Sequence, residues 1–331
     1  MKKKKKVKVH FGNLIVLIII IGIGIFGIKT LYKQLNTDDT NNTNSENKFE
    51  SDPIKDKLVN LGYSKSESEE IINNLDKEEI EKIDKQYDYL VEFSKIKYFH
   101  IENIERYINL KNKSDYSYDE IVMRVNTSID KEFYTDIKTA DNPNDLLVLV
   151  NKFYALPSGI EPNDLIQVEG VKMQREAGEA LEEMATAMRN DGLKIILQSG
   201  YRSEDTQSYL YNRYVARDGK EKADTYSARP NHSEHQTGLA IDVSHDGTLE
   251  EYFEDTPQFE WLQDNAHKYG FILRYPKDKV YMTGYTYEPW HYRYVGIEVA
   301  TIIKNENITF EEYYVKYKGL YWLSPFFLNI K

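Results

Sequence analysis

Hydrophobic residues follow a helical period in the first part of this chain. In the region 55–140, up to about Met123, apolar residues recur at spacings of three and four among Glu and Lys, as in Ile71, Ile72 and Leu75. This period is typical of amphipathic helices. The sequence of this region contains no group of residues typical of a catalytic or metal-binding site. It therefore predicts a small helical spacer or docking module.

In the second half of the chain, helical and strand-like periods are mixed. Helices are expected over Met173–Asn190, Ser203–Arg217, Glu298–Asn305 and Phe310–Lys316, and strands over Leu193–Gln198, Leu239–Val243, Phe271–Tyr275 and His291–Val295. Strands interspersed with helices, with short turns between several strands, predict an α+β domain around a mostly antiparallel sheet. We place this domain at residues 141–318.

An apolar run near the N-terminus predicts a membrane anchor. Residues 14–28 are unbroken apolar or Gly, so we place a transmembrane helix at 11–30. Six of the first eight residues are Lys, which places a basic tail, residues 1–10, in the cytoplasm. The alternative is a cleaved signal peptide, but no Ala-x-Ala-like site follows the run. A retained anchor makes this a single-pass protein of the cell membrane, with its catalytic domain outside the cell.

The segments that flank the predicted folded regions have unusual compositions. Residues 31–54 are mostly polar and predict a flexible linker, because they cannot bury a core. Residues 319–331 form an aromatic tail, which we expect to dock on the domain surface. The whole chain has a net charge of −11, and eight of its Lys lie in the first 35 residues, so the remainder is more acidic still. This balance argues against nucleic-acid binding.

Two short segments carry the candidate chemistry. The first runs Ser-Glu-His-Gln-Thr-Gly-Leu-Ala-Ile-Asp and contains His235 and Asp242, and the second is Glu288-Pro-Trp-His291. Because the chain has no Cys, any metal must be held by His and carboxylate side chains. Two His, one Asp and a spare Glu are what a catalytic zinc site needs, since three ligands leave a fourth position open for water. The spare carboxylate can then take a proton from that water.

The spacing Glu288-x-x-His291 does not indicate a helical zinc motif. Pro289 disfavours helical backbone at Glu288, and the alternation after His291 indicates a strand. Glu288 is therefore expected on the loop that enters this strand, close to the metal without being a ligand.

The two segments resemble the VanY-type zinc D-alanyl-D-alanine carboxypeptidases and their L,D-carboxypeptidase relatives. Further pieces match in order, and the resemblance covers roughly residues 144–316. These pieces are Leu149-Val150-Asn151-Lys152, Ser199-Gly200-Tyr201-Arg202-Ser203, Tyr269-Gly270-Phe271 and Arg274-Tyr275-Pro276. The resemblance implies the compact zinc-peptidase fold shared with Hedgehog-like domains.

The resemblance also implies roles for individual residues. It implies one Zn²⁺ held by His235, Asp242 and His291, with Glu288 as general base and later general acid. Arg202 would face the scissile carbonyl, or alternatively grip the terminal carboxylate of the substrate. The remaining candidates are Gln207 and Ser233, as substrate or second-layer contacts, and His232 and His245, which the family pattern does not use as ligands.

The expected function is a zinc carboxypeptidase that trims the terminal D-alanine from peptidoglycan stem peptides outside the cell membrane. One alternative is an L,D-carboxypeptidase acting on tetrapeptide stems, which shares the same motifs. An alternative of another class is a catalytically inactive wall-binding or signalling module. That alternative predicts a missing ligand or base, and none is missing.

Overall fold

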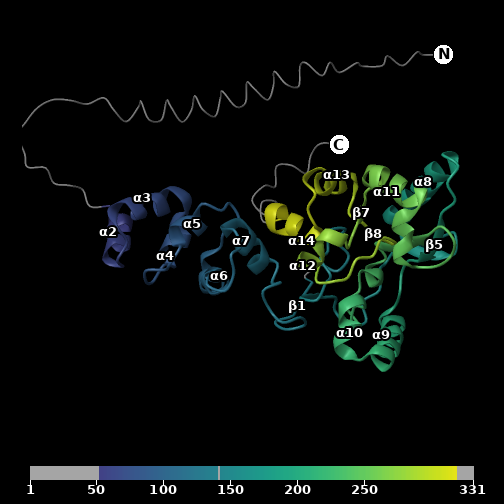
Figure 1. Ribbon diagram of the computed structural model, residues 1–331, viewed down its shortest axis with the longest axis horizontal. Helices are drawn as coiled ribbons and strands as arrows, with labels where there is room; N and C mark the ends of the chain where they lie inside the picture. Colours follow the sequence, from purple (N-terminus) through teal and green to yellow (C-terminus); the bar gives the residue numbers. More distant parts are fainter. Residues whose placement is uncertain (1–51, 141, 319–331) are drawn as a thin grey trace, which may run out of the picture. The chain divides into compact units, whose positions relative to one another are not determined.

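The computed structural model describes residues 52–140 and 142–318. The predicted anchor at 11–30 and the aromatic tail lie outside the described residues, as does nearly all of the predicted linker. Within the described ranges, no helix has both the length and the apolar character needed to cross a membrane. The described residues from Pro53 belong to one compact unit (Figure 1).

Short helices form the N-terminal part of this unit, as the helical period predicts. They are α2 (Pro53–Asn60), α3 (Lys65–Asn74), α4 (Lys77–Glu81), α5 (Leu90–Ser94), α6 (Ile104–Lys111) and α7 (Tyr118–Asn126). Helix α3 begins at a capping box in which the Ser64 hydroxyl accepts a hydrogen bond from the Glu67 N–H and the Glu67 carboxylate accepts one from the Ser64 N–H. The apolar faces bury Ile71, Phe93 and Tyr107 in a core of their own.

Two small two-stranded sheets follow the helical region along the chain. Strand β1 (Lys138–Thr139) pairs in parallel with β2 (Tyr154–Ala155). Strands β3 (Leu165–Val168) and β4 (Val171–Gln174) form an antiparallel hairpin, and α8 (Arg175–Asn190) follows directly. The predicted helix start at Met173 is therefore wrong, because that residue pairs with Ile166 in the hairpin.

A four-stranded sheet in the order β5-β6-β8-β7 forms the centre of the second half. Its strands are β5 (Ile196–Ser199), β6 (Ala240–Ser244), β7 (Phe271–Leu273) and β8 (His291–Tyr294). All three pairings are antiparallel. The remaining helices are α9 (Glu204–Asp218), α10 (Lys220–Tyr226), α11 (Pro257–Asn265), α12 (Val280–Thr283), α13 (Ile297–Glu306) and α14 (Phe310–Tyr313).

The two faces of β6 have different roles. Ile241 and Val243 are fully buried, and they belong to the same hydrophobic core as Leu181 of α8 and Leu262 of α11. Figure 1 shows both helices beside the strands of this sheet. Side chains alternate along a strand, so Asp242 projects from the opposite face. One face therefore anchors the sheet in the core, and the other is available for chemistry.

Candidate active site

The register of the central sheet brings Asp242 and His291 together. Strands β6 and β8 pair so that these two residues are direct partners. Directly opposed residues project from the same face of a sheet. As a result, Asp242 Oδ1 lies 3.1 Å from His291 Nδ1.

His235 reaches the same point from a short 3-10 turn, Glu234–Thr237, that precedes β6. Gly238, with a φ of 70°, ends this turn and lets the chain enter the strand. The ring is oriented by its Nδ1–H, which donates a hydrogen bond to the Gly200 carbonyl oxygen at 2.8 Å. This bond fixes the tautomer, so that Nε2 is unprotonated and lies 3.2 Å from Asp242 Oδ2.

These three side chains form a buried donor set that can hold a metal ion. One ligand atom from each of His235, Asp242 and His291 lies within 4.8 Å of the others. Asp242 Oδ1 has no hydrogen-bond partner among the described residues, although it is buried. Two imidazole nitrogens and one carboxylate oxygen fit Zn²⁺ in a catalytic site with an open fourth position.

The electrostatics of the donor set favour a bound cation. Burial and the Arg202 guanidinium lower the pKa of His235 to about 4, so this ring is neutral, as a ligand must be. Burial would also lower the pKa of His291, but the carboxylates of Asp242, Glu234 and Glu288 outweigh it and raise that pKa to about 9. The excess of negative charge around His291 is what a divalent cation would neutralise.

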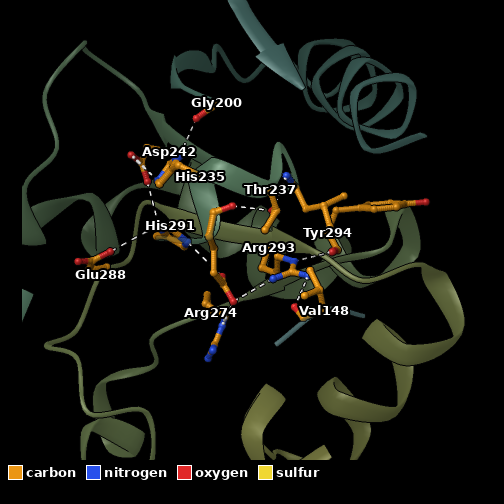
Figure 2. Close-up of polar contacts among 12 residues, drawn as sticks. Val148, Gly200, His235, Thr237, Asp242, Arg274, Glu288, His291, Arg293 and Tyr294 are labelled. Atoms are coloured by element: carbon orange, nitrogen blue, oxygen red, sulfur yellow. Dashed lines mark hydrogen bonds and ion pairs between the residues drawn. The ribbon is translucent and has the colours of Figure 1, made fainter. Parts of the chain in front are cut away.

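Glu288 lies on the loop before β8, beside the donor set (Figure 2). Its Oε2 is 3.6 Å from His291 Nδ1, and its side chain is 13% exposed. The Glu288 N–H donates to the Tyr275 carbonyl oxygen, which holds the loop against the end of β7. Burial, helped by the charge of Asp242, raises the pKa of Glu288 to about 7. A carboxyl group with such a pKa can both take and return a proton near neutral pH.

Arg202 and Gln207 form the neighbouring wall. Arg202 Nη2 donates to Asp242 Oδ2 at 2.6 Å and lies 2.9 Å from His235 Nε2. Gln207 Oε1 accepts a hydrogen bond from Arg202 Nη1 at 3.3 Å, while its amide nitrogen donates to the Ala228 carbonyl. In this structure Gln207 therefore links Arg202 to the backbone carbonyl of Ala228.

Other predicted residues take different places. Ser233 is buried and lines the same cavity as the donor set. His232 Nδ1 lies 2.7 Å from the Asn151 carbonyl oxygen, and His245 Nε2 lies 3.8 Å from an oxygen of Asp246. Neither belongs to the group of donors that could hold a metal.

The donor set opens into a cavity of about 490 Å³. Tyr275, Tyr287 and Trp290 contribute aromatic walls, and Glu250 and Glu251 contribute carboxylates. This volume lies in the range of pockets that enclose small ligands. The cavity can therefore admit the end of a peptide to the donor set.

Comparison with known proteins agrees with this geometry. Residues 170–297 match the family model VanY, D-alanyl-D-alanine carboxypeptidase. The putative carboxypeptidase YodJ of Bacillus subtilis is 42% identical over 212 residues, which cover 58% of this chain and 78% of that protein. The chain belongs to the VanY family. The protein is a carboxypeptidase.

Two further relatives of this VanY-family chain are informative. A D-alanyl-D-alanine carboxypeptidase of Enterococcus faecalis is 36% identical over 176 residues, covering 50% of this chain and 65% of that protein. The solved structure of the LdcB LD-carboxypeptidase is 42% identical, with a TM-score of 0.52, and the match covers 56% of this chain and 92% of that one. The described fold is thus a VanY-like peptidase fold with mixed helix and sheet content.

The sequence analysis gave no role to a buried ionic cluster beside His291, although two of its members, Glu234 and Arg274, lie within the matched motifs. Glu234, Arg274, Arg293 and Glu311 are each at most 2% exposed and are linked by ion pairs. Burial would raise the pKa of Glu234, but the two arginines hold it well below its usual range. Arg293 could have been noticed, because it lies two residues after His291 on the same face of a strand. No sequence pattern of this kind links Glu311 to the site.

Proposed function

We propose that this protein removes the C-terminal D-alanine from peptidoglycan stem peptides that end in D-Ala-D-Ala. The observation that carries the proposal is the pairing of Asp242 with His291 across β6 and β8, which completes a buried donor set with His235 beside Glu288. Membership of the VanY family and the name of the Enterococcus faecalis relative support the substrate.

The residues that would hold Zn²⁺ follow from the hydrogen bonds of the two rings. His235 would bind through Nε2, because its Nδ1 donates to Gly200. His291 would bind through Nδ1, which faces Asp242 and Glu288. When bound, the metal supplies a Lewis acid and lowers the pKa of a coordinated water to about 7.

The surrounding side chains supply proton transfer and charge. Glu288 would accept the proton of the attacking water and return it to the departing amine of D-alanine. Arg202 can stabilise the oxyanion that develops at the scissile carbonyl, or grip the terminal carboxylate of the substrate. The aromatic walls formed by Tyr275, Tyr287 and Trp290 would exclude water from the bound peptide end.

A second candidate is L,D-carboxypeptidase activity on tetrapeptide stems. It is favoured by the LdcB LD-carboxypeptidase, whose structure covers 56% of this chain at 42% identity. The two activities differ in the residue before the cleaved bond, and both use the same donor set. Product analysis with both substrates separates them.

The test is mass spectrometry of products from a pentapeptide stem, a tetrapeptide stem and an all-L control peptide. Loss of one alanine from the pentapeptide supports the proposal, and loss from the tetrapeptide alone supports the second candidate. Glu288→Gln should keep stoichiometric zinc and lose about 10² to 10⁴ in rate, since Gln fills the same space but cannot take a proton. Efficient cleavage of the all-L peptide, or near wild-type turnover by zinc-loaded Glu288→Gln, would refute the assignment.

The location of the enzyme is a further part of the proposal. We propose that the apolar run at residues 11–30 holds the protein in the cell membrane, with the catalytic domain outside the cell. Peptidoglycan stem peptides are exposed on that side of the membrane. The basic residues before the run support this orientation.

A further inference from the structure

A buried carboxylate, Glu234, lies directly behind the metal-binding face of the site. Both arginines of the buried cluster bind the same oxygen of this residue. Arg274 Nε donates to Glu234 Oε1 at 2.8 Å, and Arg293 Nη1 donates to that oxygen at 3.0 Å. The other oxygen, Oε2, has no hydrogen-bond partner among the described residues. One carboxylate oxygen is thus bound by both arginines, and the other is available to accept a hydrogen bond.

The other hydrogen bonds of the two arginines go to other acceptors. Arg274 uses Nη1 and Nη2 to bind both carboxylate oxygens of Glu311 in α14. Arg293 uses Nη2 to bind the backbone carbonyl oxygens of Leu146 and Val148. Within the described part of the chain, neither guanidinium makes a hydrogen bond to Glu234 Oε2. This division of contacts keeps Oε2 available on the side that faces His291.

His291 presents a matching unpaired donor. Its Nε2 lies 3.6 Å from Glu234 Oε2 and, within the described part of the chain, has no hydrogen-bond partner. A shift of roughly half an ångström would bring the two atoms to hydrogen-bond distance. Figure 2 shows the His291 side chain between Glu288 on one side and Arg293 on the other. A carboxylate accepts but does not donate, so it can pair only with a protonated Nε2.

We propose that Glu234 is a positioning residue for the metal: it accepts the hydrogen of His291 Nε2–H and thereby keeps Nδ1 unprotonated and directed at the metal site. Metal-binding histidines commonly donate their second N–H to a carboxylate, which orients the ring and raises its basicity. Here the two histidines use different acceptors. His235 donates to a backbone carbonyl, and His291 donates to a carboxylate that is itself fixed by two arginines. This inference rests on the proposed zinc site.

The test compares zinc affinity in two variants of the same cluster, measured with zinc alone in competition with a coloured chelator. Glu234→Gln should weaken zinc binding by about 10-fold to 100-fold, because loss of such an outer partner has this typical effect. Peptidase activity of Glu234→Gln should recover in excess zinc. Glu311→Gln is the matched control, since it also removes a buried charge beside Arg274 but does not touch His291. Its stability should fall while its zinc affinity changes by less than about threefold.

Equal weakening in both variants would show general loosening of the cluster and would overturn the proposal, as would wild-type affinity in Glu234→Gln. If Glu234→Gln does not fold, nitrogen NMR of ¹⁵N-histidine-labelled wild-type protein with zinc decides the question. A proton on His291 Nε2 supports the role of Glu234, and a proton on Nδ1 overturns it. Failure of the wild-type protein to bind zinc at all would instead refute the proposed function.

Discussion

Gly200 offers a sharp test of how the sheet positions His235. A Cβ placed on this residue would lie 2.4 Å from the Lys172 carbonyl oxygen and 3.0 Å from Met173 Sδ. The first contact is with backbone, so Gly200→Ala must separate β4 from residue 200 by roughly 0.6 Å to reach even the tightest normal distance of 3.0 Å. That movement strains the hydrogen bond from the Tyr201 N–H to the same Lys172 oxygen, which is 2.7 Å long.

The magnitude follows from these two contacts. Overpacking costs about 1 to 3 kcal/mol, and the weakened hydrogen bond adds about 1 kcal/mol. We therefore expect Gly200→Ala to lower the free energy of unfolding by roughly 2 to 4 kcal/mol. The Gly200 carbonyl also accepts the Nδ1–H of His235 at 2.8 Å, so its displacement should weaken zinc binding by about tenfold or more.

Urea unfolding and chelator competition measure the two effects separately. Gly178→Ala in α8 is the control, because the nearest atoms to its Cβ would be side-chain atoms of Ile166 and Val168, and no hydrogen bond links Gly178 to a proposed metal ligand in the described part of the chain. It should leave zinc affinity unchanged. A Gly200→Ala protein with wild-type stability and wild-type zinc affinity would show that the close approach of β4 does not position His235.

Three further outcomes are expected. His235→Ala and His291→Ala should each lose stoichiometric zinc in metal analysis, and full retention by both would show that the donor set is wrong. Lys152 is buried, donates to the Asp224 carbonyl, and has its pKa lowered by burial to about 8. The pKa of Lys152 is lower in the folded state than in the unfolded state, so the free energy of unfolding should rise as the pH rises through about 8. Between pH 7 and pH 9 the wild type should gain roughly 1 kcal/mol in urea unfolding relative to Lys152→Met. The same change of stability with pH in both proteins would contradict this. Cell fractionation should find the full-length protein in membranes with its domain open to external protease, whereas a shortened form in the medium would exclude a retained anchor.

The strands and helices that carry the site follow closely from the sequence pattern. The strand expected over Leu239–Val243 is present as β6, and its alternation buries Ile241 and Val243 in the core while Asp242 joins the donor set. The helix expected over Ser203–Arg217 is present as α9, and Ser203 caps it by accepting a hydrogen bond from the Thr206 N–H. Pro289 correctly excluded a helix at Glu288. These features are local, so neighbouring residues suffice to predict them.

The features that the sequence did not predict depend on contacts between distant residues. The start of α8 was misplaced because Met173 satisfies a helical period, while its pairing with Ile166 depends on the hairpin. Glu311 lies 37 residues from Arg274, and no local pattern links the two. Arg202 was assigned to the substrate, yet its contact with Asp242 could be found only in the folded sheet.

The pairing of β6 with β8 also bears on how the protein selects its native sheet. A slip of one residue would place Trp290 or Tyr292 opposite Asp242 and turn one strand's side chains to the other face. The misregistered sheet could not assemble the donor set, so a metal would bind only the native pairing. At a metal concentration of about 1,000 times Kd, such selective binding contributes about 4 kcal/mol. The ion would therefore stabilise the native strand alignment relative to a misregistered one.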